Sequence, residues 1–219
     1  MLLPDTMTIH PSDLEIRRIV TDSDLDGVVT AAILRRWWTD AEVVFGHPGE
    51  LRAGVYDELI DEWTAICDLP VHPNCGLSID HHQSNRSEKN EAGAIVVWEN
   101  KPSAARIAFE LFHQIIDLSD LEGLLDWVDK IDSGSISKEE FLSHDPAIWL
   151  SRIVDSEEGT ASWILEQLRV GVSTEDILND PKISKLASEK EEELGLLNEI
   201  ILSTMRVDDR IAIVRFDGS

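Results

Sequence analysis

The sequence predicts an α/β fold: a mostly parallel sheet flanked by helices, followed by a helical region and a long connecting helix. Two observations favour this fold class. Up to Lys101, short β-branched runs alternate with helical patterns, as they do when strands are joined by crossover helices. Beyond Lys101 the hydrophobic spacing is almost entirely helical.

The first half of the chain is expected to form the sheet. Residues 15–21 (EIRRIVT) are predicted to be the first strand, and the apolar face of residues 27–38 predicts the helix that follows it. A second helix is expected around residues 55–63. Further strand-like runs lie at residues 42–45, 64–67, 77–79 and 94–98.

The second half is expected to be mainly helical. Ser103 is a suitable cap for a helix that extends to Ile116. Further helical patterns cover residues 121–130, 139–142, 147–154 and 160–170. Residues 182–205 are strongly charged, with apolar residues spaced as in one long helix, and residues 210–216 (RIAIVRF) alternate as a half-buried strand does.

The chain is strongly acidic. Its 219 residues include 43 Asp and Glu against 19 Lys and Arg, a formal net charge of -24. The acidic residues are spread along the whole sequence, so the surface as a whole repels phosphate backbones and membranes. We therefore expect neither duplex nucleic acid nor a membrane as a partner. No apolar stretch approaches the ~20 residues that cross a bilayer.

The two cysteines, Cys67 and Cys75, are interpreted as reduced thiols. A chain of this length buries a full hydrophobic core, so it does not need a disulfide for stability. This cysteine usage predicts a cytoplasmic protein.

Three aspartates, Asp22, Asp24 and Asp26, occupy alternate positions directly after the first predicted strand. Carboxylates placed in this way on a turn between strand and helix predict a cation site. An EF-hand calcium loop begins with a similar pattern of aspartates and requires Glu at its twelfth position. Counted from Asp22, the twelfth residue of this sequence is Ile33, so it is not an EF-hand. The nucleophile motif of haloacid-dehalogenase-like phosphatases matches residues 24–28, but the unbroken apolar strand that normally precedes it is interrupted here. A helix cap explains one or two of the aspartates, but not three.

Two further predicted strands end in acidic or imidazole side chains. Asp68 follows one, and Asp80, His81 and His82 follow the next. The carboxyl ends of parallel strands lie along one edge of a sheet, where ligands of such folds bind, so these residues are expected to converge. Asp132, at the end of a helical pattern, is expected to join them.

This combination of side chains favours hard divalent cations. Aspartate carboxylates with an imidazole suit Mn²⁺ or Mg²⁺ better than structural zinc, which prefers thiolates and several histidines. One ion would leave several carboxylates unneutralised. Two ions about 4 Å apart, the arrangement of two-metal phosphoryl hydrolysis, make better electrostatic sense.

In their order and spacing, these residues resemble the four motifs of the DHH phosphoesterase superfamily. That group includes RecJ-type exonucleases, short-oligoribonucleotide hydrolases, cyclic-dinucleotide phosphodiesterases and family II inorganic pyrophosphatases. The resemblance covers roughly residues 15–155 and rests on Asp22-Ser23-Asp24-Leu25-Asp26-Gly27, Asp68, Asp80-His81-His82 and Asp132-Ser133-Gly134.

The resemblance implies two Mn²⁺ ions, with Mg²⁺ as an alternative, and an attacking water that the ions activate. One ion would be bound by Asp22, where many members have His, and Asp24; the other by Asp26, His81 and Asp132; and Asp68 would bridge them.

Three further residues have implied roles in catalysis or substrate binding. His82 would act beside the scissile phosphate, although a purely structural role is also open. Asp80 would orient a histidine rather than bind metal. Arg86 is a candidate for binding substrate phosphate, but it could equally pair with Glu88 or face solvent.

Many DHH proteins carry a second, substrate-binding domain with a Gly- and His-rich loop, and this sequence contains no such loop. By this resemblance, residues 1–180 would be the metal-binding domain and residues 181–206 the connecting helix. Residues 207–219 would begin a second domain that is missing or truncated.

The expected function is a Mn²⁺-dependent phosphodiesterase or phosphomonoesterase acting on small nucleotides, such as short single-stranded oligonucleotides. A RecJ-like single-strand exonuclease is an alternative, although no Lys/Arg cluster offers a track for a long strand. A non-catalytic partner of the replication machinery is a third reading. A homodimer is possible.

Overall fold

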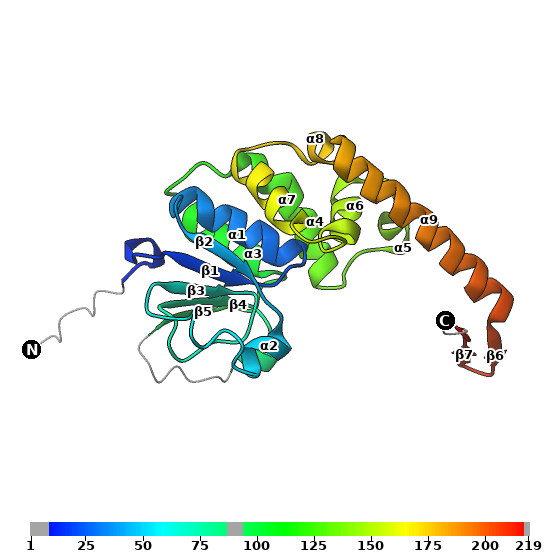
Figure 1. Cartoon of the computed structure of the whole chain (residues 1–219), viewed down its shortest axis with the longest axis horizontal. Helices are drawn as coiled ribbons and strands as arrows, with labels where there is room; N and C mark the ends of the chain where they lie inside the picture. The colour runs from blue at the N-terminus through cyan, green and yellow to red at the C-terminus, as the bar shows by residue number, and fades with distance from the viewer. Residues whose placement is uncertain (1–8, 87–93, 217–219) are drawn as a thin grey trace, which may run out of the picture.

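The computed structural model describes residues 9–86 and 94–216 and contains a five-stranded, all-parallel sheet (Figure 1). The strand order is β2-β1-β3-β4-β5. The strands are β1 (Arg18–Thr21), β2 (Glu42–Phe45), β3 (Thr64–Cys67), β4 (Leu77–Asp80) and β5 (Ile95–Trp98). The predicted α/β class is confirmed, since every predicted strand of the first half is present.

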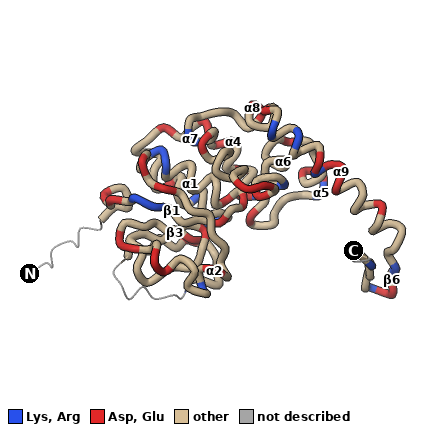
Figure 2. Tube along the Cα trace, in the orientation of Figure 1, with Lys and Arg blue, Asp and Glu red and all other residues tan. Residues whose placement is uncertain are grey.

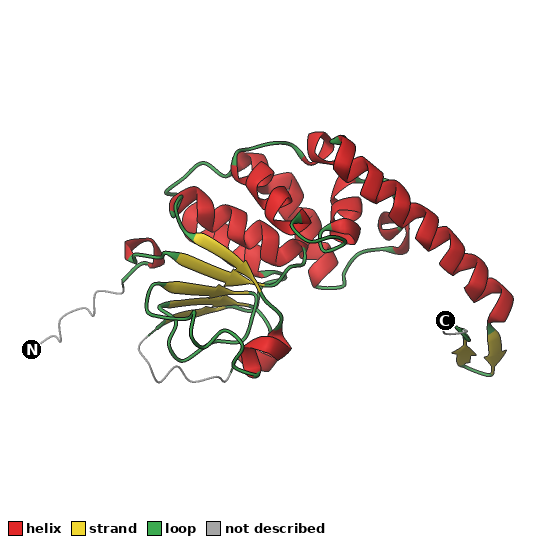
Figure 3. Ribbon diagram, in the orientation of Figure 1, coloured by secondary structure: helices red, strands yellow, loops and turns green. Residues whose placement is uncertain are grey.

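The two faces of the sheet are covered differently, as Figure 3 shows. On one face lie α1 (Leu25–Trp37) and α3 (Ala104–Phe112), which pack against each other, and α7 (Thr160–Arg169) packs on α1. These helices and the sheet enclose the main apolar core. The other face is covered by a smaller cluster that includes Leu51 and Ile60, from the short helix α2 (Pro48–Arg52) and the loop after it.

The helix predicted around residues 55–63 is wrong. The helix in this region is α2, which begins with Pro48 after a cap by His47 and ends at Arg52. Gly54 then adopts a φ of +78°, a conformation that ends helices and favours glycine. Turns follow up to Leu59.

The helical half confirms the predicted pattern. Ser103 caps α3 by accepting the N–H of Arg106. The remaining helices of this part are α4 (Glu122–Asp132), α5 (Lys138–Phe141), α6 (Pro146–Ile153) and α8 (Thr174–Leu178), of which α8 was not predicted. Single 3₁₀ turns occur at η1 (Pro11–Asp13), η2 (Gln83–Asn85) and η3 (Ser119–Leu121).

The long C-terminal helix is also confirmed as α9 (Pro181–Thr204), of which Ile183 and Leu186 are buried. The strand predicted at residues 210–216 is shorter, β7 (Ile211–Ile213), and pairs antiparallel with β6 (Arg206–Asp208). Both strands are fully exposed, so the expectation of a half-buried strand is wrong. The division into residues 1–180, 181–206 and 207–219 stays a prediction.

Acidic residues occur along the entire described chain (Figure 2). None of its helices combines the length and apolar character needed to cross a membrane. Cys67 and Cys75 are buried free thiols. Burial raises the pKa of Cys67 well above its usual range and that of Cys75 to about 11, so both stay protonated at neutral pH.

The turn that links β1 to α1 requires glycine at position 27. A Cβ at Gly27 would lie 2.2 Å from the carbonyl oxygen of Asp22 and 2.9 Å from Oγ1 of Thr21. The absence of a side chain therefore allows the start of α1 to pack directly on the acidic turn that precedes it.

We expect Gly27→Ala to lower the free energy of unfolding by about 1–3 kcal/mol, because the backbone must move to accept the methyl group. Urea denaturation measures the change. Gly123→Ala is the matched control: a Cβ there meets nothing within 4 Å, and alanine in α4 should raise stability by at most about 1 kcal/mol. Equal stability of the two variants would contradict the close approach at Gly27.

Candidate metal centre

Acidic and imidazole side chains converge at the carboxyl edge of the sheet. Nε2 of His81, just after β4, lies 3.0 Å from Asp132 Oδ2, 3.5 Å from Asp68 Oδ1 and 3.7 Å from Asp26 Oδ2. These residues come from the start of α1, the end of β3 and the end of α4. The expected convergence of strand ends therefore occurs for the residues predicted to form the second metal site.

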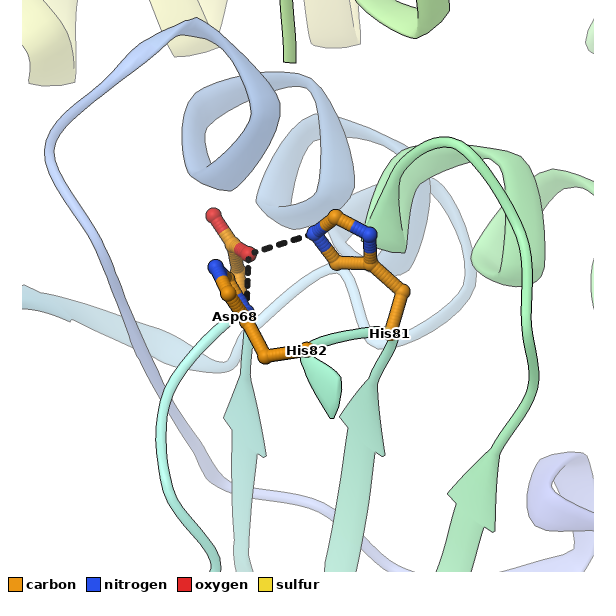
Figure 4. Close-up of side chains that lie close together, drawn as sticks. All are labelled: Asp68, His81 and His82. Carbon is orange, nitrogen blue, oxygen red and sulfur yellow. Dashed lines mark ion pairs between the residues drawn. The ribbon is translucent and has the colours of Figure 1, made fainter. Parts of the chain in front are cut away.

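The described residues contain two groups whose potential ligand atoms all lie within 4.8 Å of one another. One is Asp26, His81 and Asp132, and the other is Asp68, His81 and His82. Figure 4 shows both imidazoles next to the same carboxylate oxygen of Asp68. Nδ1 of His82 lies 3.6 Å from Asp68 Oδ1. Asp68 thus faces both histidines.

Asp68 is held in an unusual backbone conformation. Its φ is +56°, in the left-handed region that aspartate tolerates better than most residues, and its N–H donates to the carbonyl of Ile79 at 2.9 Å. The side chain is 3% exposed. Such strained positions persist where the surrounding structure determines them, and here the strain turns a carboxylate toward the histidines.

Asp26 has two roles in the structure. Its Oδ2 accepts the N–H of Ala104 at 2.8 Å, and its Oδ1 accepts that of Ala105 at 2.7 Å, so it binds the first turn of α3. A carboxylate oxygen keeps a further lone pair after accepting one hydrogen bond. Asp26 can therefore hold α3 in place and still face a cation beside His81.

Asp132 is positioned by a clamp between α3 and α4. The hydroxyl of Ser103 donates to Asp129 Oδ1 at 2.6 Å, and Nε of Arg106 donates to Asp129 Oδ2 at 2.8 Å. Arg106 also binds Asp126. Asp126 and Asp129 thus neutralise a cation on α3, and Asp132, at the end of the same helix, is left to face His81.

Asp22 and Asp24 lie next to this cluster, but their carboxylates make local contacts. Asp24 Oδ1 accepts the N–H of Gly27 and caps α1, and Asp22 Oδ1 accepts the N–H of Ser23. Within the described chain, neither belongs to the two compact ligand groups. The first metal site, expected from Asp22 and Asp24, therefore stays a prediction.

Burial and like-charge repulsion dominate the electrostatics of the site. Burial, with the field of Asp132, raises the pKa of Asp26 to about 7, and burial with the field of Asp22 raises the pKa of Asp24 to about 6. Burial also raises the pKa of Asp68 well above its usual range. The site holds more negative charge than its neighbours neutralise.

His81 responds in the opposite sense. Burial acts to lower the pKa of its imidazole, but the contacts to Asp132 and Asp68 outweigh this and raise the pKa to about 11. His81 is therefore protonated at neutral pH in the metal-free protein, and its positive charge faces the acidic cluster. A divalent cation would compete with this proton for the same carboxylates and imidazole.

Asp80 holds the second histidine. Its Oδ1 accepts the backbone N–H groups of His81 and His82 and lies 2.9 Å from Nδ1 of His82, and its Oδ2 accepts from Nδ2 of Asn85 at 2.7 Å. These contacts fix the orientation of the His82 ring relative to Asp80. The catalytic roles of Asp80 and His82 themselves stay predictions.

Arg86 and His47 are further cationic or imidazole groups near the site. The guanidinium of Arg86 lies 5.0 Å from the centroid of a Trp98 ring; Glu88, its suggested partner, lies outside the described residues. His47 was not among the residues predicted from the sequence. It stands two residues after strand β2, and this position near a strand end is the signal that would have identified it.

The pKa shifts lead to a pH-dependent prediction for the metal-free protein. The folded-state pKa of Asp26 lies above the unfolded value of 3.8, so the folded protein binds more protons, and this contribution to stability is lost as the pH rises from 3.8 through about 7. A bound cation replaces these protons. Mn²⁺ should therefore raise the Tm more at about pH 8 than at about pH 5.

Thermal unfolding with Mn²⁺ and with a chelator, at both pH values, measures this difference. An equal rise in Tm at the two pH values would contradict a cation site at the carboxylate cluster.

Comparison with known proteins places the fold. No family model and no curated protein matches the chain. Among solved structures, it matches the pGpG-specific phosphodiesterase PggH from Vibrio cholerae with a TM-score of 0.76 and 24% identity, over 90% of this chain and 67% of that chain.

Two other solved structures are more distant. An uncharacterized protein from Helicobacter pylori G27 matches with a TM-score of 0.55 and 13% identity, over 89% of this chain and 73% of that one. The exonuclease RecJ bound to manganese matches with a TM-score of 0.44 and 17% identity, over 88% and 68% respectively. The similarity to PggH, with the parallel sheet described above, shows that this chain shares the fold of that protein.

Proposed function

We propose that the protein is a metal-dependent phosphoester hydrolase that acts on short nucleotides, with Mn²⁺ as the ion and Mg²⁺ as an alternative. The observation that carries this proposal is the buried cluster of Asp26, Asp68 and Asp132 around His81, at the carboxyl edge of the sheet. The DHH-like fold supports it, because the cluster lies where the motifs of that fold were expected.

The residues of the cluster fit a divalent cation. Oδ1 of Asp68 and Nε2 of His81 are buried, lie 3.5 Å apart and make no well-oriented hydrogen bond with the described residues, so a carboxylate oxygen and an imidazole nitrogen are available to an ion. Carboxylates and one imidazole are a donor set that suits Mn²⁺ or Mg²⁺. When bound at such a site, divalent ions activate water and neutralise charge that develops on phosphate oxygens.

His82, the histidine next to His81, is the proposed proton donor. The contact of Nδ1 with Asp80 raises the pKa of His82, and its side chain is 46% exposed. We infer that the cationic form donates a proton from Nε2 to the leaving oxygen of the substrate while Asp80 stabilises the imidazolium. Asp80 also keeps the ring turned in one direction, since it accepts from Asn85 and from two backbone N–H groups.

Two observations support a short substrate. The net charge of -24 repels a long polyanion more than a dinucleotide with few phosphates. In addition, most Lys and Arg side chains of the described chain pair with carboxylates, and so do not line a track for a single strand. We therefore propose a dinucleotide such as pGpG, the substrate in the name of the similar Vibrio protein, as the first candidate.

Asp68→Asn should reduce Mn²⁺-dependent hydrolysis of pGpG by more than about a hundredfold, because the carboxylate that faces both histidines is lost. Product release measures the rate, and circular dichroism checks the fold. Asp40→Asn is the control, since Asp40 is exposed in the loop before β2, at the end of the sheet opposite the cluster. Mn²⁺-dependent turnover that persists in Asp68→Asn would refute the assigned site.

The length of the substrate should affect the rate. With Mn²⁺ present, turnover per molecule should be higher for a dinucleotide than for a single strand of about thirty nucleotides, because repulsion grows with the number of phosphates. Steady-state rates at low and high salt measure both effects. A long strand that is cleaved as fast as the dinucleotide would favour a RecJ-like exonuclease instead.

A further inference from the structure

The region around α2 places a cation near the candidate centre. Most arginines of the described chain form ion pairs, for example Arg36 with Asp120 at 2.6 Å. Arg52, at the end of α2, has no carboxylate partner among the described residues. Its Nη2 donates to the neutral Asn85 Oδ1 at 3.3 Å. A guanidinium has five N–H groups, so most of its donors are still available.

Arg52 lies close to the candidate centre. Asn85, to which it donates, in turn donates to Asp80 at 2.7 Å, and Asp80 contacts His82. Two hydrogen bonds therefore connect Arg52 with the carboxylate that orients His82. Figure 1 shows α2 near the carboxyl ends of the strands, on the side away from the large helical layer.

His47 precedes α2 and lies beside the acidic turn. β2 pairs with β1 in a register that places Phe45 opposite Thr21, and the N–H of Gly46 donates to the carbonyl of Thr21 at 2.8 Å. The next residue, His47, is therefore one strand away from Asp22. The fields of His47 and His82 both act to lower the pKa of Asp22, which burial raises.

Local hydrogen bonding determines what His47 offers to a ligand. Its Nδ1 accepts the N–H of Gly49 at 3.1 Å, so the neutral ring carries its hydrogen on Nε2. The exposed imidazole is thus a hydrogen-bond donor at Nε2. Arg52, at the other end of this short helix, is a second donor, and two such donors suit an anion.

The nearby carboxylates of this segment are engaged elsewhere. Glu50 Oε2 accepts the hydroxyl of Tyr56 at 2.6 Å, and Asp57 Oδ1 lies 3.2 Å from Nε2 of His72. Neither group therefore neutralises Arg52. In a protein of such high negative charge, two available donors beside the candidate centre form a local exception to the repulsion of phosphate.

We propose that His47 and Arg52 form a subsite for a phosphate group that is not cleaved, namely the terminal phosphate monoester of a short nucleotide. The inference rests on the proposed function and adds to it a substrate class, 5′-phosphorylated dinucleotides. The scissile phosphate lies at the Asp68 and His81 cluster, and the terminal phosphate extends toward α2. A monoester carries about -1.5 to -2 charges at neutral pH, more than a diester, so the subsite favours it.

The test compares pGpG with GpG, which differ in the terminal phosphate alone. In His47→Asn the new side chain still caps α2, because its amide oxygen accepts the N–H of Gly49, but the Nε2 donor is lost. Arg52→Gln keeps a donor for Asn85 and removes the charge. We expect each variant to lower the ratio of kcat/KM for pGpG to that for GpG by about tenfold, mainly through KM.

The matched controls are His113→Asn and Arg17→Gln, which change the same residue types far from α2. His113 lies at the end of α3, and Arg17 contacts Glu15 and a ring of Trp63 beyond the amino end of β1. Both controls should leave the substrate ratio unaltered.

Binding provides a readout that does not depend on turnover. Calorimetric titration of pGpG into Asp68→Asn, with and without His47→Asn, should show a Kd that is weaker by about tenfold in the double variant. Thermal unfolding of each variant confirms that it is folded.

The possible failures are distinguishable. Wild-type protein that hydrolyses neither dinucleotide with Mn²⁺ would refute the proposed function. Hydrolysis with an unchanged substrate ratio in both variants would refute the subsite alone. An equal loss for pGpG and GpG, together with weaker Mn²⁺ binding in His47→Asn, would overturn the subsite by assigning His47 to the metal.

Discussion

The burial of several carboxylates around one imidazole is the constraint on which the rest of the site depends. Asp26, Asp68 and Asp132 all approach Nε2 of His81 within 3.7 Å. Like charges this close cannot all be ionised in a buried environment unless positive charge is added. Protons supply that charge in the metal-free protein, and in the proposed function a divalent cation would supply it. The burial of these carboxylates therefore favours the binding of cations at the site.

The same residues that favour cation binding also hold the fold together. Asp26 binds the first turn of α3 through both carboxylate oxygens, so the helix that borders the cluster is attached to one of its acids. Arg106, on α3, pairs with Asp126 and Asp129 on α4, which places Asp132 at the end of α4 beside His81. Geometry at the site and packing of the helical layer are consequently linked.

The distribution of cations explains how an acidic protein can attract phosphate at one place. Elsewhere in the described chain, arginines such as Arg35 and Arg36 form ion pairs that tie helices together, and they contribute little free positive charge. Arg52 contacts a neutral amide. In the proposed function, Arg52 and the cations bound by the carboxylate cluster would together concentrate attraction for anions at the carboxyl edge of the sheet. The long-range repulsion then disfavours long polyanions more than short ones.

The sequence by itself determined the fold class and most of the candidate ligands, because hydrophobic spacing and the positions of strand ends are local properties. Asp68 and His81 were predicted on that basis, whereas the helix expected at residues 55–63 was not found. Only the tertiary structure decided that Asp26 binds the start of α3, 78 residues away, and that His47 lies beside the acidic turn. Those contacts depend on the order of strands in the sheet and on helix packing, which local spacing does not encode.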